Sequence, residues 1–241
     1  MSVFLLSDEC RHRTVAESSN FNNLLLKAGP HMLRIDLYME ITCPWCLIGQ
    51  YRLDKVLKGN FSDLTVDIQH HPILLMPSTP PAGVYIPDLL RQRYGITDFK
   101  AAFARPEADA RQSGLNLNLE RQLYAYSTIP AHALIAAAGN RGTQHQLAYA
   151  IKSAYFLDAK NISDLDVLAS IATGFGFGKR EAIELAQDPD LKKGVENASL
   201  ESAAAGIRAV PHFVFNHRTG ISGGRTEQEI ASAIEHALLA A

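Results

Sequence analysis

Two cysteines separated by a proline and a tryptophan are the residues of this chain best suited to chemistry. Cys43 and Cys46 enclose Pro44-Trp45, directly after the alternating segment Leu33–Met39 and at the start of a helical pattern. The first turn of a helix offers unpaired N–H groups and a positive dipole end, which stabilise a thiolate. Such sites lower a cysteine pKa from about 8.5 toward neutrality. We therefore expect Cys43 to attack disulfides and Cys46, one turn further and facing inward, to resolve the mixed disulfide.

The same Cys-x-x-Cys spacing could form half of a zinc site. Zinc would require two further ligands, usually a second such pair or two histidines at comparable spacing. His70 and His71 are adjacent and would point to opposite faces of a strand, and Cys10 lies in a segment with no folding pattern. We therefore expect a redox-active pair and neither a metal nor another cofactor.

A second signal is Val210-Pro211 immediately before the apolar segment Phe213–Phe215. Proline is unfavourable inside a central strand but acceptable at its first residue. An ordinary proline at a strand edge is the alternative interpretation. Together with the cysteine pair, however, a Val-Pro step before a C-terminal strand predicts a thioredoxin-like fold.

The hydrophobic periodicity predicts how the elements position these residues. Leu33–Met39 alternates as a half-buried strand, a helix follows to about Gly59-Asn60, and 64–68 alternates again. Strand, helix and strand in this order imply a parallel pair joined by a crossover. Strand character returns at 213–215 and 219–222, followed by a helix that Thr226 and Glu229 would cap.

Between these two parts of the core, strand signals vanish and the pattern is helical to about Ala205. Ser163 with Asp166 predicts one helix start, and Asp188-Pro189 predicts another. Neither sheet fragment could bury its faces alone, so one domain over 32–241 is expected. We predict an α/β fold with a thioredoxin-like core (33–76 and 207–241) and a large helical insertion (about 85–205).

The first 31 residues differ from the rest, since a periodic pattern begins only at Leu33. Val3–Leu6 is too short for the apolar region of a secretory signal, and no basic segment precedes it. We expect a disordered tail or a non-native extension, with Met32 favoured as the true start, and we regard Cys10 as a bystander. Without an export signal, the expected compartment is the cytoplasm, where such a cysteine pair is more often catalytic or metal-binding than structural.

The composition points to no special partner. The chain has 241 residues, 47% of them apolar and 20% charged, and a net charge of -2. This balance gives no basic surface for nucleic acid and no apolar stretch that approaches a membrane span. We expect the partners to be proteins or small molecules that carry thiols or disulfides.

The chain resembles the FrnE-like branch of the DsbA family, thioredoxin-like proteins with an inserted helical domain, from Leu33 to about Leu238. The resemblance rests on six blocks: Glu40–Gly49, His71–Pro77, Ala131–Leu134, Ala154–Phe156, Gly206–Phe215 and Ile221–Gly224. It implies a cis peptide bond before Pro211, with Val210 and Pro211 packed beside the two cysteines. The backbone of this pair would then bind an extended substrate segment.

Four other residues are candidates for the site. Trp45 is expected to offer an exposed apolar contact to partners, with a half-buried position as the alternative. Glu40 is either a base that assists proton transfer at the resolving thiol or a solvated residue at a strand end. His212 either contacts substrate or tunes the attacking thiol as a nearby cation, or it is a satisfied strand-end histidine, which we favour. His132 is expected to serve packing or a buried hydrogen bond.

These features predict a dithiol–disulfide oxidoreductase that acts on protein or small-molecule thiols, with glutathione as a candidate co-substrate. One alternative is a glutathione-dependent isomerase or transferase of the hydroxychromene-carboxylate isomerase type, on the same fold. Proteins of that type typically carry serine at the position of Cys43 and lack Cys46, so the presence of both thiols argues against it. The other alternative is a peptide-binding chaperone in which the dithiol is secondary.

Overall fold

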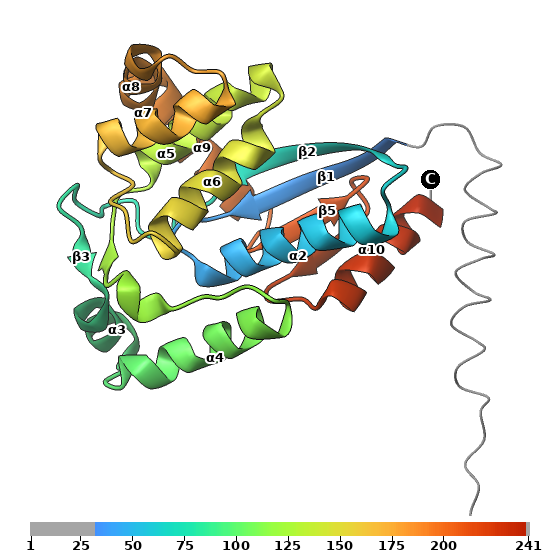
Figure 1. The fold of residues 1–241 in the computed structure, drawn as a ribbon, viewed down its shortest axis with the longest axis horizontal. Coiled ribbons are helices and arrows are strands. Elements are labelled where there is room, and N and C mark those ends of the chain that lie inside the picture. Colours follow the sequence, from blue (N-terminus) through green and yellow to red (C-terminus); the bar gives the residue numbers. More distant parts are fainter. Residues whose placement is uncertain (1–31, 240–241) are drawn as a thin grey trace, which may run out of the picture.

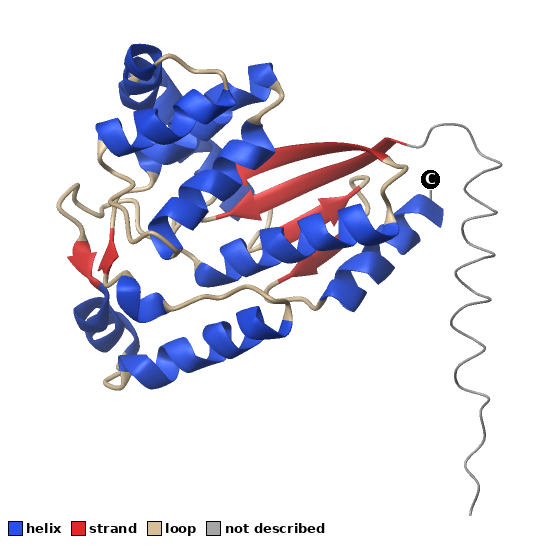
Figure 2. Cartoon of the chain, in the orientation of Figure 1, coloured by secondary structure: helices blue, strands red, loops and turns tan. Residues whose placement is uncertain are grey.

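A computed structural model describes residues 32–239 of the chain (Figure 1). The expectations for the first 31 residues, including Cys10, lie outside the described residues. Between the two ends of the described part, the chain forms a mixed sheet with helices packed against it (Figure 2).

The sheet has four strands in the order β2-β1-β5-β6. Strand β1 (Met32–Met39) pairs in parallel with β2 (Thr65–Pro72) and antiparallel with β5 (His212–Phe215), which pairs antiparallel with β6 (Thr219–Ser222). Alternate side chains of β1 are fully buried, as the sequence alternation predicts: Leu33, Ile35 and Leu37. This buried central strand ends just before the cysteine pair.

Helix α2 (Pro44–Asn60) makes the crossover from β1 to β2 and lies between α10 (Glu227–Leu239) and α6 (Gln144–Phe156) (Figure 1). Thr226 and Glu229 cap α10 reciprocally, as predicted, because each backbone N–H donates to the other side chain. Leu53 and Val56 of α2 and the buried apolar residues of α10 form one core cluster with the inward side chains of β1 and β5 and with the two cysteines.

The insertion between β2 and β5 contains both helices and a small sheet. Its longer elements are α3 (Ile86–Tyr94), α4 (Phe99–Gln112), α5 (Ile129–Ala137), α6, α7 (Leu165–Ala172), α8 (Lys179–Gln187) and α9 (Pro189–Ala204). Short 3-10 turns lie at Leu119–Arg121, Ala138–Arg141 and Thr173–Phe175. Figure 1 shows α5 to α9 gathered beyond the carboxyl end of β1, and α3 and α4 on the other side of α2.

Two expectations for the insertion are wrong. Strands β3 (Val84–Tyr85) and β4 (Tyr124–Ala125) form an antiparallel pair within it, and two residues are too few to show a strand period. Helix α7 begins one residue later than predicted, because Asp164 rather than Ser163 accepts the first N–H groups. The cap at Asp188 is confirmed, since its side chain accepts from the N–H groups of the first turn of α9.

A buried arginine ties α4 to the core. Arg52 of α2 is 2% exposed and donates to the Ser113 hydroxyl and to the carbonyl oxygens of Asp109 and Arg225. Its guanidinium also lies 2.8 Å from the Asp109 carboxylate. Because removing one partner of a buried charge is costly, this network holds α4 firmly against α2. No helix within residues 32–239 is long and apolar enough to cross a membrane.

Helix α2 approaches the segment before β5 most closely at Gly49. A Cβ atom at this position would lie 2.8 Å from Pro211 Cγ and 3.1 Å from Phe213 Cζ. Only a residue without a side chain allows this contact, so Gly49 sets the distance between the cysteine helix and the Val210-Pro211 step.

We predict that Gly49→Ala lowers the free energy of unfolding by about 1–3 kcal/mol, because overpacking forces the proline segment away from α2. Gly59→Ala on the same helix is the matched control, since nothing lies within 4 Å of its added Cβ. Urea unfolding of both variants measures the difference. Equal stability of the two variants would show that α2 can move without cost.

Candidate active site

The cysteine pair lies at the junction of β1 and α2, as predicted. Cys43 is the N-cap residue of α2, with extended backbone angles of φ -90 and ψ 117, and Pro44 follows in the first turn. Its carbonyl oxygen accepts the first helical hydrogen bonds, from the N–H groups of Cys46 at 3.0 Å and Leu47 at 3.4 Å. Both cysteines are free thiols, with Cys43 9% exposed and Cys46 fully buried.

The surroundings shift the pKa values of the two thiols in opposite directions. A hydrogen bond from the Cys46 thiol and the backbone N–H groups of Cys46 and Trp45 lower the pKa of Cys43, against the opposing effects of burial and of the Glu40 charge. Burial, followed by the thiol of Cys43, raises the pKa of Cys46 well above its ordinary value. Of the two thiols, Cys43 therefore ionises more readily and Cys46 less readily than an ordinary cysteine.

Trp45 is half-buried rather than fully exposed. A Cβ atom added at Gly224 would lie 2.5 Å from Trp45 Cε3, so the indole ring packs directly on the backbone of this glycine. The guanidinium of Arg105, on α4, lies 5.6 Å from the centre of the indole ring, within range of a cation–π contact. Arg105 could not be predicted from the sequence, because a single arginine on a distant helix belongs to no motif.

The Val210–Pro211 peptide bond is cis, as predicted. Val210 packs on the core cluster that contains both cysteines. Within residues 32–239, neither its N–H nor its carbonyl oxygen is hydrogen-bonded, whereas the carbonyl oxygen of Pro211 accepts from Gly223 N–H at 2.8 Å.

His212 lies in register with Tyr38 and with Ser222 on the two neighbouring strands. Its Nδ1 is 2.6 Å from the Ser222 hydroxyl oxygen, and its ring centre lies 5.7 Å from that of Tyr38. Burial lowers the pKa of His212, which favours the neutral ring. The neighbouring Phe213 faces α2, so the His212 side chain lies on the other face of the sheet.

Glu40 is 2% exposed, so it is not the solvated residue of the alternative interpretation. Its carboxylate accepts four hydrogen bonds, from the backbone N–H groups of Ile41, Thr42 and Leu75 and from the Thr128 hydroxyl. This carboxylate therefore ties the end of β1 to the loop after β2 and to the first turn of α5. His132 is buried, as expected for a packing role, with Nε2 3.6 Å from Glu40 Oε1.

A buried amine from the insertion completes the surroundings of the thiols. Lys152 of α6 is 0% exposed, and its Nζ lies 2.7 Å from Met39 Sδ at the end of β1. Burial lowers the pKa of Lys152 from its ordinary value of 10.5 to about 7, while the charges of Cys46 and other nearby groups act to raise it. The sequence did not reveal this residue, because a lysine beside an apolar helical stripe is usually solvated.

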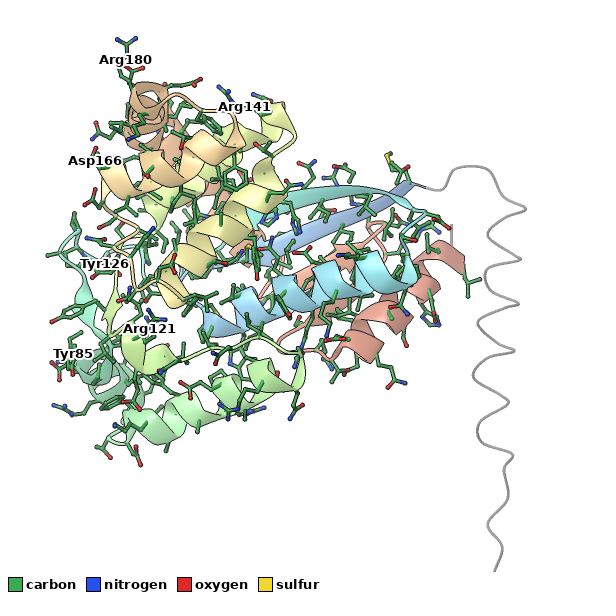
Figure 3. All side chains as sticks on the ribbon, in the orientation of Figure 1. Tyr85, Arg121, Tyr126, Arg141, Asp166 and Arg180 are labelled. Atoms are coloured by element: carbon green, nitrogen blue, oxygen red, sulfur yellow. The ribbon has the colours of Figure 1, made fainter. Side chains whose placement is uncertain are left out.

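A cavity of about 430 Å³ opens beside Cys43. Its walls are mainly apolar side chains from the start of α2, from α3, from α4 and from α6: Pro44, Trp45, Leu90, Phe103 and Phe156. The small sheet of β3 and β4 adjoins it, with Tyr85 and Tyr124 ring centres 5.5 Å apart. Figure 3 shows Tyr85, Tyr126 and Arg121 around this side of the insertion.

The family model of the DSBA-like thioredoxin domain matches residues 34–235. The chain belongs to this family. Membership makes the protein a thiol–disulfide oxidoreductase with a thioredoxin-like fold, as the cysteine pair and the Val-Pro step predict. Its place in the FrnE-like branch stays a prediction.

Solved structures of the DSBA-like fold agree with this membership. A probable DsbA oxidoreductase from Streptomyces coelicolor is 26% identical, with a TM-score of 0.77 over 86% of this chain and 90% of that one. The cytosolic disulfide reductase DsbM from Pseudomonas aeruginosa, solved with GSH, is 16% identical, with a TM-score of 0.61 over 86% and 99%. A 2-hydroxychromene-2-carboxylate isomerase is 12% identical, with a TM-score of 0.66 over 85% and 96%. The last two share the fold alone.

The side chains described for this DSBA-like domain do not form a metal site. Within residues 32–239, no group of three or more histidine, cysteine, aspartate or glutamate side chains is arranged to hold a metal ion.

We predict that Lys152→Met makes this DSBA-like domain more stable, by an amount that depends on pH. The unfolded chain binds a proton at Lys152 below about 10.5, whereas the folded chain does so only below about 7. Stability is therefore lost as the pH falls through this window, and the loss is complete below it. The methionine variant has no amine to protonate and does not lose this stability. The difference in the free energy of unfolding between the variant and the wild type should therefore grow as the pH falls from about 10.5 to about 7.

Urea unfolding of the reduced protein across this pH range measures the effect. Lys160→Met, at an exposed lysine that follows α6, is the control and should show no such trend. A Lys152→Met curve parallel to that of the wild type would contradict the depressed pKa.

Proposed function

We propose that this oxidoreductase exchanges disulfides with thiol- or disulfide-bearing partners through its Cys-Pro-Trp-Cys motif, with Cys43 attacking and Cys46 resolving. The observation that supports these roles is the inequality of the two thiols. Cys43 caps the helix and retains an exposed fraction of 9%, whereas Cys46 is fully buried beneath it. Because the thiolate is the nucleophile, the thiol with the lowered pKa and the accessible sulfur attacks first.

The exchange proceeds in two displacements. The Cys43 thiolate attacks one sulfur of the substrate disulfide, so a mixed disulfide forms and the other substrate sulfur leaves with the electron pair of the broken bond. Cys46 then loses its proton and attacks Cys43, which closes the Cys43–Cys46 disulfide and releases the second substrate thiolate. The substrate gains two electrons and takes up two protons, and the reverse sequence oxidises a substrate dithiol.

The substrate-binding surface would be formed by Trp45, Val210 and Pro211 around the attacking sulfur. The free N–H and carbonyl groups of Val210 could pair with an extended substrate backbone. The apolar cavity beside Cys43 supports a preference for substrates that carry an apolar group next to the reactive sulfur. Contact of His212 with substrate stays a prediction, since its ring packs on Tyr38 and Ser222.

We also propose a cytoplasmic location and glutathione as a co-substrate. A cytosolic disulfide reductase of the same fold was solved with GSH, although identity at this level carries the fold alone. The direction of exchange depends on the reduction potential of the dithiol against its compartment.

The alternatives differ from this proposal in what they require of the thiols. Glutathione-dependent isomerisation or peptide chaperoning would survive in a Cys43→Ser, Cys46→Ser double variant, whereas disulfide exchange would not. Both activities of this double variant should therefore be tested, the first with added glutathione and the second by suppression of client aggregation.

We predict opposite behaviour of the two single variants in a Cys10→Ser background. Cys46→Ser should attack but not resolve, so a covalent mixed disulfide with the substrate accumulates. Cys43→Ser should give neither turnover nor trapped complex, because Cys46 is buried and its pKa is raised. Intact-protein mass spectrometry after exposure to a small disulfide measures the trapped species. Equal trapping by both variants would show that the roles are assigned wrongly.

We predict that Ala102→Phe, which fills the cavity, selectively slows reaction with aromatic disulfides. The second-order rate constant of the reduced protein with dithiodipyridine should fall at least about tenfold, the scale of apolar discrimination in a pocket. The rate constant with the polar hydroxyethyl disulfide should change little. Ala101→Phe is the control, since Ala101 is an exposed neighbour outside the cavity. An equal loss with both disulfides in Ala102→Phe would contradict the apolar preference.

A further inference from the structure

The exchange reaction leaves one buried titratable group of the site without a role. Lys152 comes from α6, in the insertion, yet its amino group contacts Met39 at the end of β1, in the same core cluster as the two cysteines. Its one hydrogen bond within residues 32–239 is to the thioether sulfur of Met39, a weak acceptor. No carboxylate of the described chain lies within ion-pair distance of it.

An amine in this position is costly to protonate unless a negative charge appears nearby. A buried charge without a partner loses its solvation, so the neutral form is favoured. The groups whose charges act on Lys152 are, in decreasing order of effect, Cys46, Asp54, Cys43 and Glu40. The strongest of these partners is thus the thiol that must ionise during the resolving step.

The two carboxylates among these groups are already engaged. Glu40 accepts four hydrogen bonds, which fix its carboxylate as an acceptor of N–H and O–H groups. Asp54 lies 2.6 Å from His145 Nε2, and its side chain is 41% exposed.

The other titratable group in contact with Met39, His70, is a poor proton acceptor for the thiol. His70 contacts Met39 Sδ through Nδ1 and His145 Nδ1 through Nε2, so both ring nitrogens are occupied. Burial, and then the charge of Lys152, lowers the pKa of His70 well below its ordinary value. His132 faces Glu40.

We propose that Lys152 supplies the positive charge against which Cys46 ionises, by taking up the proton that the thiol gives up in the resolving step. This inference rests on the proposed exchange function and replaces Glu40, which the sequence suggested for proton transfer. It also gives the insertion a direct part in the chemistry, because the thioredoxin-like core provides both thiols and α6 provides the amine.

The step conserves charge and atoms. In the mixed disulfide, the proton of the Cys46 thiol passes to the neutral amine of Lys152, which leaves a thiolate beside an ammonium group. The thiolate attacks Cys43 Sγ, so the Cys43–Cys46 bond forms and the bond from Cys43 to the substrate sulfur breaks. The departing substrate thiolate takes the electron pair, and the ammonium group returns its proton to that thiolate or to solvent.

The test uses the full chain in a Cys10→Ser background and an aromatic disulfide, dithiobis-nitrobenzoate, as the probe. The attack of Cys43 releases one coloured thiolate, and resolution by Cys46 releases the second, so stopped-flow absorbance separates the two steps. Lys152→Met should slow the second release about tenfold at neutral pH, as expected if the pKa of Cys46 rises by one unit. The rate of the first release, which reports attack by Cys43, should change less.

The pH profile separates this role from a structural one. The rate of the resolving step should increase with pH as Cys46 ionises, and in Lys152→Met this increase should occur at higher pH than in the wild type. The two resolving rates should become equal at a pH where Cys46 ionises without Lys152. Lys152→Gln is the second neutral variant, in case the methionine variant does not fold, and Lys160→Met is the control with unchanged rates. Coincident resolving profiles of the wild type and a folded Lys152 variant would overturn the inference. If the reduced wild-type protein releases no second thiolate, the proposed function itself fails.

Discussion

One helix end holds two thiols whose surroundings shift their pKa values in opposite directions, and the elements around the site produce this difference. The N-terminus of α2 provides free N–H groups for a thiolate at Cys43, while its first turn buries Cys46 completely. The two sulfurs are chemically identical, so only their surroundings separate them. The buried strand β1 fixes where the helix begins, and the contact between Gly49 and Pro211 fixes how closely the Val210-Pro211 step approaches it.

The helical insertion is part of the active site rather than an appendage. It supplies most of the apolar wall of the cavity beside Cys43, and it places Arg105 over the ring of Trp45. It also buries Lys152 against Met39, in the core cluster that contains both cysteines, where burial disfavours the charge of the amine. We therefore propose that the core keeps a common dithiol geometry, while the insertion shapes the substrate site and, through Lys152, sets the proton affinity of Cys46.

The sequence predicts the parts of this arrangement that depend on local pattern. Alternation identifies β1, proline at the first turn marks the start of α2, and the Cys-x-x-Cys spacing places both thiols at this helix start. The Val-Pro step before β5 indicates a thioredoxin-like fold because it occurs together with the Cys-Pro-Trp-Cys motif.

Contacts between distant segments leave no such pattern. Strands β3 and β4 have two residues each and exist only because the chain brings them together. In the sequence, Glu40 is equally compatible with a solvated residue at a strand end. Only its four hydrogen-bond donors show that it is buried and connects separate segments. Lys152 follows a predicted apolar stripe as an ordinary charged residue would, and its burial depends on how α6 packs beside α2 and β1.

We propose that, of the two cysteines within residues 32–239, Cys43 alone carries the reactive thiolate in the reduced protein. Alkylation with iodoacetamide over a pH series, followed by peptide mass spectrometry, measures the rate at each cysteine separately. Cys43 should react faster than Cys46, with an apparent pKa below that of a free cysteine, while Cys46 should remain unmodified until the protein unfolds. Faster alkylation at Cys46, or a Cys43 pKa at or above that of a free cysteine, would contradict the account.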